Sequence, residues 1–235
     1  MGPREPASIA GVTVAACILA ASPETALRDV DGTPNVRRLV DLAWAGGAFP
    51  VVVIAADPEG GIATALAGAS VILGAPAPVE LGPAGQMARA IELARAEVDA
   101  TDAALLWPAR IGWLDAETVT SLIEAHGTDR ATLLRPAYRG TPGWPILVPA
   151  GMLATLRALA PDQMPPSIAE ALAAAAPSRT VELGDPGVVF GLDTPRDEVP
   201  PFEGPPGPPA GHRHEWGALV AASPDEAPEL PTTRD

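Results

Sequence analysis

The stretch AACILAASPETALRDVDGTPNVRRLV, from Ala15 to Val40, decides the fold class of this chain. It runs from an apolar strand through a turn of small residues and a charged loop into a helix. An open α/β sheet binds its ligand beyond the carboxyl ends of its strands, and a helix that starts there offers unpaired N–H groups to phosphate. We therefore expect a strand over residues 12–21, a loop over the next dozen residues, and a ligand site at this junction.

The same alternation of strand and helix continues downstream. Apolar residues at helical spacing predict a helix from Val36 up to the double glycine at 46–47, and the run FPVVVIA (49–55) is the most β-like in the chain. A short helix over 62–67 and a strand over 70–73 follow. Because strands joined through right-handed helical crossovers pair in parallel, these units predict a parallel sheet.

In the second half of the chain, strands and helices alternate less regularly. Its clearest signal is Asp115, whose carboxylate is placed to cap a helix that ends near Gly127. The other expected elements are helices over 87–98, 152–159 and 167–176, strands over 103–107, 132–134, 145–148, 181–183 and 188–190, and a turn or helix start over 194–197. Together the elements predict a three-layer α/β/α sandwich, Rossmann-like, with a mostly parallel twisted sheet of about six or seven strands.

Charge and composition exclude several function classes. The net charge of −14 argues against a nucleic-acid partner, because affinity for a polyanion depends first on an excess of basic residues. The chain contains no lysine, so all fifteen basic residues are arginine. This composition rules out Schiff-base chemistry, a Walker lysine and a lysine general base.

The length of 235 residues suits one α/β domain with a tail. We expect a flexible N-terminus over residues 1–10, the domain over 11–199, and a disordered tail over 200–235. The tail is dense in proline, glycine and acidic residues, which bury too little apolar surface to offset the entropy of ordering. A docked patch over 216–220 is the one exception that we expect within it.

Two short signals concern the compartment and the thiol. The apolar run 11–21 is too short to span a bilayer, which predicts a protein without a membrane partner. A signal peptide is the open alternative for this run, but its single upstream cation, Arg4, fits a cytoplasmic protein better. The single cysteine, Cys17, lies inside this run and is expected to be a small buried thiol rather than a nucleophile. The sequence HRHE at 212–215 lacks the usual ligand set of a metal site.

Six segments occur in an order that carries a family resemblance. They are ILAAS (18–22), DGTPNVRRLVDLAWAGG (31–47), GPAGQMARAIELA (82–94), LLWPARIGWLDAETVTSLIEAH (105–126), RPAYRGTPGWPILVP (135–149) and GLDTPRD (191–197). In this order they resemble the molybdenum-cofactor nucleotidyltransferases, the MobA/MocA-like group with a glycosyltransferase-A type fold. The resemblance implies transfer of a nucleotide from an NTP to a phosphorylated acceptor such as molybdopterin, with Mg²⁺ between the phosphates.

The nucleotide loop of that family departs from its pattern here. In the family, the first strand ends in Leu-Ala-Ala-Gly, and Arg and Lys in the following loop hold the phosphates. In this chain Leu19, Ala20 and Ala21 match, Ser22 replaces the glycine, and Arg28 is the one nearby cation. The resemblance assigns these five residues to the nucleotide, with a weakened grip on the triphosphate.

The metal position departs as well. Members of the family carry a metal-binding Asp two residues before a Pro, ahead of a Leu-Asp-Pro-Glu-Thr segment. Aligning on Asp115 places Arg110 at the metal position and Gly112 at the proline. A guanidinium cannot ligate Mg²⁺, whereas Asp193, the second ligand by resemblance, is retained. Arg110 as a simple surface residue, and Asp193 as the cap of the turn at 194–195, remain open alternatives.

The remaining assignments follow from the resemblance. Gly85 and Gln86 lie at the turn that contacts the base and sugar in the family, although glutamine is also common at helix starts. The loop that faces the acceptor would contribute Tyr138, Gly140, Gly143 and Pro145. The sequence Gly-Thr-Pro-Gly at 140–143 is equally ordinary turn chemistry.

Two hypotheses about function result. In the first, the chain keeps the fold, has weak or lost nucleotidyl transfer, needs no cofactor, and serves as a binding or regulatory module with a protein partner. In the second, Arg110 replaces the charge of the metal or Asp193 still holds Mg²⁺, and the chain remains an enzyme for an NTP or another phosphorylated ligand. A polar cleft on which Arg28, Arg110 and Asp193 converge would favour the second hypothesis, and a cleft filled by the protein's own side chains the first.

Overall fold

The central strand of the sheet is β1 (Val14–Ala20), which is paired on both sides. The structure, a computed structural model, describes residues 12–205. Parallel partners of β1 are β4 (Val51–Ala55) on one side and β6 (Ala103–Pro108) on the other. All three strands are apolar and almost completely buried, as expected for parallel strands that are covered on both faces.

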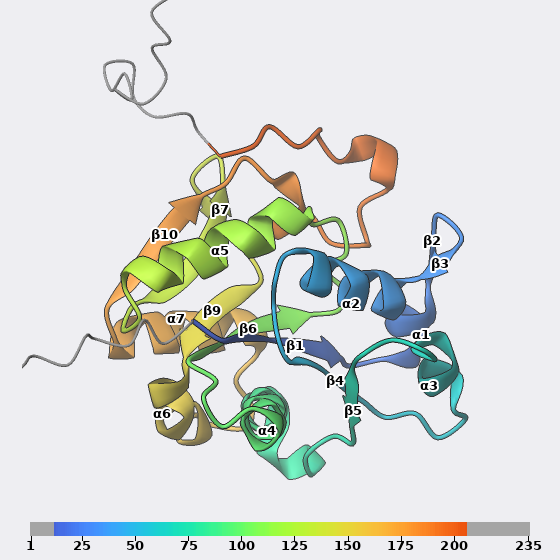
Figure 1. Cartoon of the computed structure of the whole chain (residues 1–235), viewed down its shortest axis with the longest axis horizontal. Helices are drawn as coiled ribbons and strands as arrows, with labels where there is room; N and C mark the ends of the chain where they lie inside the picture. The colour runs from blue at the N-terminus through green and yellow to red at the C-terminus, as the bar shows by residue number, and fades with distance from the viewer. Residues whose placement is uncertain (1–11, 206–235) are drawn as a thin grey trace, which may run out of the picture.

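The whole sheet has the strand order β10-β7-β9-β6-β1-β4-β5, with β8 added to β7 (Figure 1). The strands other than the central three are β5 (Ile72–Gly74), β7 (Leu133–Tyr138), β8 (Thr141–Pro142), β9 (Ile146–Pro149) and β10 (Ser178–Glu182). Strand β9 runs antiparallel to both β6 and β7, so β6 and β7 are parallel to each other. The carboxyl ends of β4, β1, β6 and β7 therefore meet at one edge, and the predicted mostly parallel sheet is confirmed.

Helices cover the sheet on both sides (Figure 1). On one face α4 (Gly82–Glu97) packs against β1 and β4 and contacts α6 (Leu153–Arg157) and α7 (Pro165–Ala175). On the other face α2 (Asn35–Ala45) packs against β1 and α5 (Ala116–Thr128), and α5 reaches β7. These contacts produce the predicted three layers. The short elements α3 (Gly61–Ala65), η1 (Val79–Leu81) and η2 (Ala150–Met152) connect them.

The segment after β1 is more ordered than the expected loop. It contains a short helix, α1 (Pro23–Leu27), whose first turn is capped by Ser22. The Oγ atom of Ser22 accepts a hydrogen bond from the backbone N–H of Thr25 at 3.3 Å. The prediction of a continuous loop is wrong here, because a helix of five residues is too short to leave a periodic apolar signature.

A small hairpin joins α1 to α2. It pairs β2 (Asp29–Val30) with β3 (Thr33–Pro34) in antiparallel register. The two turn residues, Asp31 and Gly32, have positive φ angles of 55° and 82°. This Asp-Gly pair suits a two-residue hairpin turn, so a turn signal that was assigned to the helix start also closes a hairpin. Helix α2 then ends at the double glycine, as predicted.

A second expectation is wrong near the end of the domain. Residues 188–190 do not form a strand, because the chain makes a 3₁₀ turn, η3 (Pro186–Val188), that is started by Asp185. The Asp185 carboxylate accepts a hydrogen bond from the Gly187 N–H at 2.7 Å. Within the apolar run VVF, Val188 is buried in this turn, and Val189 and Phe190 are half-buried after it. The predicted helix start over 194–197 corresponds to η4 (Arg196–Glu198).

Two of the expected boundary segments lie largely outside the described residues. These are the N-terminus over 1–10 and most of the tail over 200–235, including the patch at 216–220. Residues 200–205 are described and contact the domain, since Glu203 donates its N–H to the Gly184 carbonyl at 2.9 Å and pairs with Arg139 at 2.6 Å. No helix within residues 12–205 combines the length and apolar character needed to cross a membrane.

The thiol of Cys17 is fully buried in β1, as predicted. Burial raises its pKa to about 12, because the thiolate would lose its hydration inside the core. At neutral pH the group is therefore a neutral thiol, and only the thiolate is a nucleophile or a metal ligand. Cys17 contributes packing and no chemistry.

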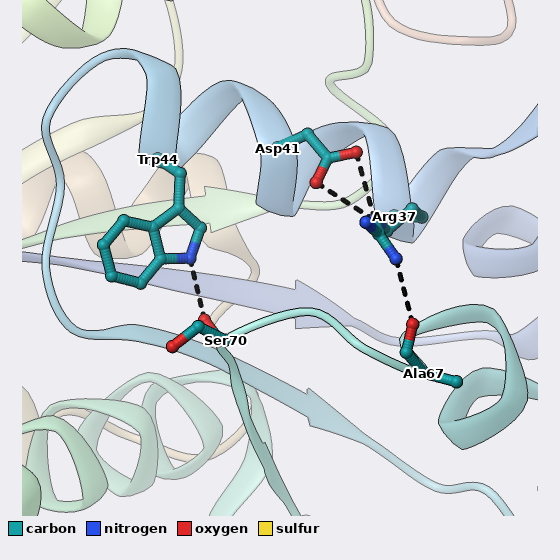
Figure 2. A network of polar contacts seen from close by, with 5 residues as sticks. All are labelled: Arg37, Asp41, Trp44, Ala67 and Ser70. Carbon is teal, nitrogen blue, oxygen red and sulfur yellow. Dashed lines mark hydrogen bonds and ion pairs between the residues drawn. The ribbon is translucent and has the colours of Figure 1, made fainter.

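Polar contacts join the outer face of α2 to the loop that precedes the edge strand β5 (Figure 2). Arg37 pairs with Asp41 one turn along the helix at 3.0 Å and donates to the Ala67 carbonyl at 3.1 Å. The indole Nε1 of Trp44 donates to the Ser70 carbonyl at 2.7 Å. The positive charge of Arg37 is therefore paired with a carboxylate.

The pH dependence of stability should reveal the buried imidazole of His126. His126 is fully buried in the last turn of α5, and neither ring nitrogen has a hydrogen-bond partner within residues 12–205. Burial lowers its pKa below the ordinary value of about 6.5, while Asp102 favours the charged form more weakly. The unfolded state then binds a proton that the folded state resists, so the free energy of unfolding should decrease as the pH falls below about 6.5.

Urea denaturation at neutral pH and at about pH 5 measures this slope. The variant His126→Leu should be less sensitive to pH than the wild-type protein over this window. Equal pH slopes for the two proteins would contradict a buried neutral imidazole.

Candidate functional site

The carboxyl edge of β1, β6 and β7 is crossed by residues 185–199, which we call the strap. In Figure 1 the strap is drawn in orange after β10. Its main chain pairs with two loops of the edge: the Trp144 N–H donates to the Val188 carbonyl at 2.8 Å, and the Leu192 N–H donates to the Arg110 carbonyl at 2.7 Å. The strap therefore lies where an open α/β sheet offers its ligand site.

Leu192 is the central contact of the strap. Its N–H donates a hydrogen bond to the Arg110 carbonyl, and its own carbonyl accepts a hydrogen bond from Nη1 of Arg28 at 2.6 Å. Its side chain is only 2% exposed and packs against Gly112, where an added Cβ would lie 2.6 Å from Leu192 Cδ2. Leu192 thus fills the space between the loop after β1 and the loop after β6.

Asn35, the first residue of α2, lies beneath this contact and is fully buried. Its Nδ2 donates to the Ala109 carbonyl at 2.8 Å and to the Thr25 carbonyl at 3.2 Å. The amide therefore joins α1, α2 and the end of β6. Sequence reasoning missed this residue, and its one available signal was a short polar side chain at a helix start.

Asp185 fixes the beginning of the strap to α5. The carboxylate is 2% exposed and accepts hydrogen bonds from the Asp115 N–H at 3.0 Å, Thr118 Oγ1 at 2.6 Å and the Gly187 N–H at 2.7 Å. Burial raises the pKa of Asp185, and the hydrogen bonds partly oppose that effect. Asp115 itself caps α5 through the Glu117 N–H, as the sequence predicted.

Trp113 holds the far part of the strap. The half-buried indole donates from Nε1 to the carbonyls of Gly191 at 3.0 Å and Thr194 at 3.1 Å. Two guanidinium groups lie over its ring, Arg38 at 5.8 Å and Arg196 at 5.6 Å from the centroid. None of these three side chains was singled out from the sequence, because the chain positions that they occupy are far apart.

The two residues predicted to act at the metal position are brought together by the main chain. Arg110 and Asp193 are both exposed, and the hydrogen bond between Arg110 and Leu192 places their segments side by side. Within residues 12–205 their side chains form no ion pair, and the Asp193 carboxylate caps no turn. No group of three His, Cys, Asp or Glu side chains suited to a metal is found in that range either.

The predicted nucleotide residues lie at and after the end of β1. Leu19 and Ala20 complete the strand, Ala21 is exposed, and Ser22 caps α1. Arg28, the one cation expected at this loop, is exposed, and its Nη1 donates a hydrogen bond to the Leu192 carbonyl. The contacts of these residues with a nucleotide remain a prediction.

The predicted base-side residues lie at the start of α4. The side-chain amide of Gln86 makes two hydrogen bonds to the backbone of Ala77. Its Oε1 accepts from the Ala77 N–H at 2.8 Å, and its Nε2 donates to the Ala77 carbonyl at 2.9 Å. Gly85 lines a cavity of about 760 Å³ between residues 75–81, the first turns of α4 and Leu159. Recognition of a base by these residues is not tested by this geometry.

The predicted acceptor-side residues follow β7. Tyr138 is buried, Gly140 has a positive φ of 79° in the turn to β8, and Pro145 follows a cis bond. A Cβ at Gly143 would lie 2.1 Å from the Val188 carbonyl oxygen, so glycine is needed there for close packing on the strap. The backbone conformation at Gly140 and the close packing at Gly143 each explain why the residue is glycine, and contact with an acceptor stays a prediction.

The sequence profile of the MobA-like NTP transferase domain matches residues 22–178. The chain belongs to this family. The matched region contains Arg28, Gln86, Arg110 and Tyr138, whereas the strap with Asp193 lies beyond its end. No curated protein matches the chain.

Solved structures support the MobA-like fold. A nucleotidyl transferase from Methanothermobacter superposes with a TM-score of 0.61 at 18% identity, covering 73% of this chain and 88% of that chain. Rv0371c from Mycobacterium tuberculosis, in complex with manganese, gives 0.56 at 15% over 73% and 88%. CMP:2-keto-3-deoxy-manno-octonic acid synthetase complexed with CTP gives 0.56 at 14% over 78% and 94%. At these identities the likeness concerns the fold.

Substitution of two carboxylates of the strap, Asp185 and Asp193, should separate a structural role from a chemical one. In the MobA-like chain, Asp185→Ala should lower the free energy of unfolding by about 3 kcal/mol, because buried N–H donors at Asp115 and Gly187 lose their acceptor. Asp193→Ala, at an exposed carboxylate, should change it by less than about 0.5 kcal/mol. Urea denaturation measures both values, and equal effects of the two substitutions would contradict the anchoring role of Asp185.

Proposed function

We propose that this MobA-like chain has weak or lost metal-dependent nucleotidyl transfer and serves as a binding or regulatory module. The observation that carries the proposal is the donor set at the metal position. There the resemblance aligns Arg110 with a metal-binding aspartate, and the neighbouring Asp193 is the one carboxylate retained. Because Mg²⁺ needs several hard oxygen ligands and is repelled by a guanidinium, this set does not fit the ion.

The strap supports the same proposal. Arg28 is the cation available to the phosphates at the loop after β1, and one of its nitrogens is bonded to Leu192. The Leu192 side chain fills the space between that loop and Gly112. A triphosphate at this edge would compete with these contacts, and the backbone would have to move to admit it.

A binding role needs an occupant, and a protein partner is our first expectation. The high negative charge argues against nucleic acid. In this role the chain uses no cofactor, and the family fold provides a rigid α/β platform whose loops at the carboxyl edge present the contact surface.

An active nucleotidyltransferase is the second candidate. It is favoured by three charged groups on one edge, Arg28, Arg110 and Asp193, and by proteins of the same fold whose structures were obtained with CTP or with manganese. In this candidate residues 19–22 contact the nucleotide, Gly85 and Gln86 the base, and the loop 138–145 a phosphorylated acceptor. Arg110 supplies positive charge toward the phosphates.

Thermal unfolding in the presence of nucleotides separates the two candidates. A ligand that binds the folded state must raise the Tm by mass action. We expect GTP, CTP, ATP and UTP at millimolar concentration to give no Tm increase that depends on Mg²⁺. A Mg²⁺-dependent increase with one nucleotide, reduced by Arg28→Gln, would overturn the proposal and establish the second candidate.

A further inference from the structure

The side chains of Arg38, Trp113 and Arg196, which we call the Arg–Trp–Arg cluster, bring two guanidinium groups to one indole ring. The guanidinium Cζ atoms lie 5.8 and 5.6 Å from the centroid of the indole ring. They come from three parts of the chain: helix α2, the loop after β6, and the strap at η4. The fold therefore brings two cations to one aromatic side chain.

Neither arginine has a carboxylate partner within residues 12–205. The ion pairs described there involve five other arginines. Among the described residues, Arg38 donates one side-chain hydrogen bond, from Nη1 to the Gly112 carbonyl, and no side-chain hydrogen bond is found for Arg196 there. Since a guanidinium has five N–H donors, most of the donors of both groups are free to bind a ligand.

The two positive charges also act on each other. The pKa of Arg38 is lowered first by its partial burial and then by the charge of Arg196, while Asp31 and Asp115 oppose these effects more weakly. The chain has a net charge of −14, yet no carboxylate within residues 12–205 forms an ion pair with either guanidinium group. An anion placed between the guanidinium groups would relieve their repulsion.

The neighbour of Arg38 on the same helix shows the ordinary alternative. Arg37 pairs with Asp41 at 3.0 Å and donates to the Ala67 carbonyl, as Figure 2 shows. Two consecutive arginines of α2 thus differ in environment: Arg37 is neutralised at the surface, and Arg38 is held against an aromatic ring with its charge uncompensated. The ring restricts the guanidinium without using its donors, which prepares it for a planar, bidentate ligand.

We propose that the Arg–Trp–Arg cluster is a metal-independent binding site for the phosphate group of a small molecule. Arginine matches the geometry of phosphate oxygens through paired N–H donors, and two such groups suit the charge of a diphosphate or of a phosphomonoester dianion. Neither arginine belongs to the residues assigned to a nucleotide or a metal above. The site is therefore independent of whether nucleotidyl transfer is retained.

The test is isothermal titration calorimetry of residues 1–235 with inorganic pyrophosphate, in EDTA and at low ionic strength. We expect saturable binding to the wild-type protein that weakens with added salt, as for exposed charges. Arg38→Gln and Arg196→Gln should each weaken the affinity about tenfold, the effect of losing one charge-assisted contact. Arg37→Gln, the matched control on the same helix, should bind like the wild-type protein.

Two further arms locate the ligand. ATP without metal should bind at least as well as inorganic phosphate, and adenosine should not bind, because the site recognises phosphate rather than the base. Arg28→Gln tests whether the anion binds instead at the loop after β1, because this substitution removes the cation of that loop. Arg196 is exposed, so its substitution should preserve the Tm and keeps the test valid if Arg38→Gln fails to fold.

Three results would overturn the proposal. The first is the absence of pyrophosphate binding at millimolar concentration and low salt. The second is equal affinity of Arg196→Gln and the wild-type protein. The third is a loss of affinity in Arg28→Gln alone, which would place the anion at the loop after β1.

Discussion

The position of Leu192 is the constraint on which the candidate site depends. Its main-chain N–H and carbonyl are both bonded, to Arg110 and Arg28, and its side chain is buried against Gly112. These contacts join the loops that follow the neighbouring strands β1 and β6, at the edge where an α/β sheet presents its ligand crevice. Ligand chemistry at this edge must therefore use groups above the strap, or displace it.

Other contacts hold the strap on both sides of Leu192. Asp185 fixes the beginning of the strap to the start of α5 through three hydrogen bonds, and Trp113 holds its later part through two carbonyls. Asn35 joins the loops below. Arg38 and Arg196 both lie over the Trp113 indole that holds the later part of the strap, and in the proposed phosphate site this contact would preorganise the two guanidinium groups.

The sequence predicted the fold class because its main signals are local. Continuous apolar strands, helical spacing in α2 and the Asp115 cap each depend on adjacent residues, and the structure confirms them. The helix α1 was too short to detect, and the apolar run at 188–190, predicted as a strand, instead begins in a 3₁₀ turn. Many contacts of the site join residues that are far apart in the sequence, such as Asp185 with Thr118 and Arg28 with Leu192. No local pattern encodes such contacts, so Asn35, Trp113 and Asp185 could not be found from the sequence.

We propose that the carboxyl edge of this member of the MobA-like family is unsuited to a metal–nucleotide complex. Electron paramagnetic resonance of Mn²⁺ tests it directly, because the signal of the free Mn²⁺–nucleotide complex changes when a protein binds that complex. At constant Mn²⁺ and CTP or GTP, the account predicts that added protein leaves the signal unchanged up to high micromolar concentration. A saturable change that Asp193→Ala abolishes and Asp197→Ala preserves would contradict it, since it would show a working metal ligand beside Arg110.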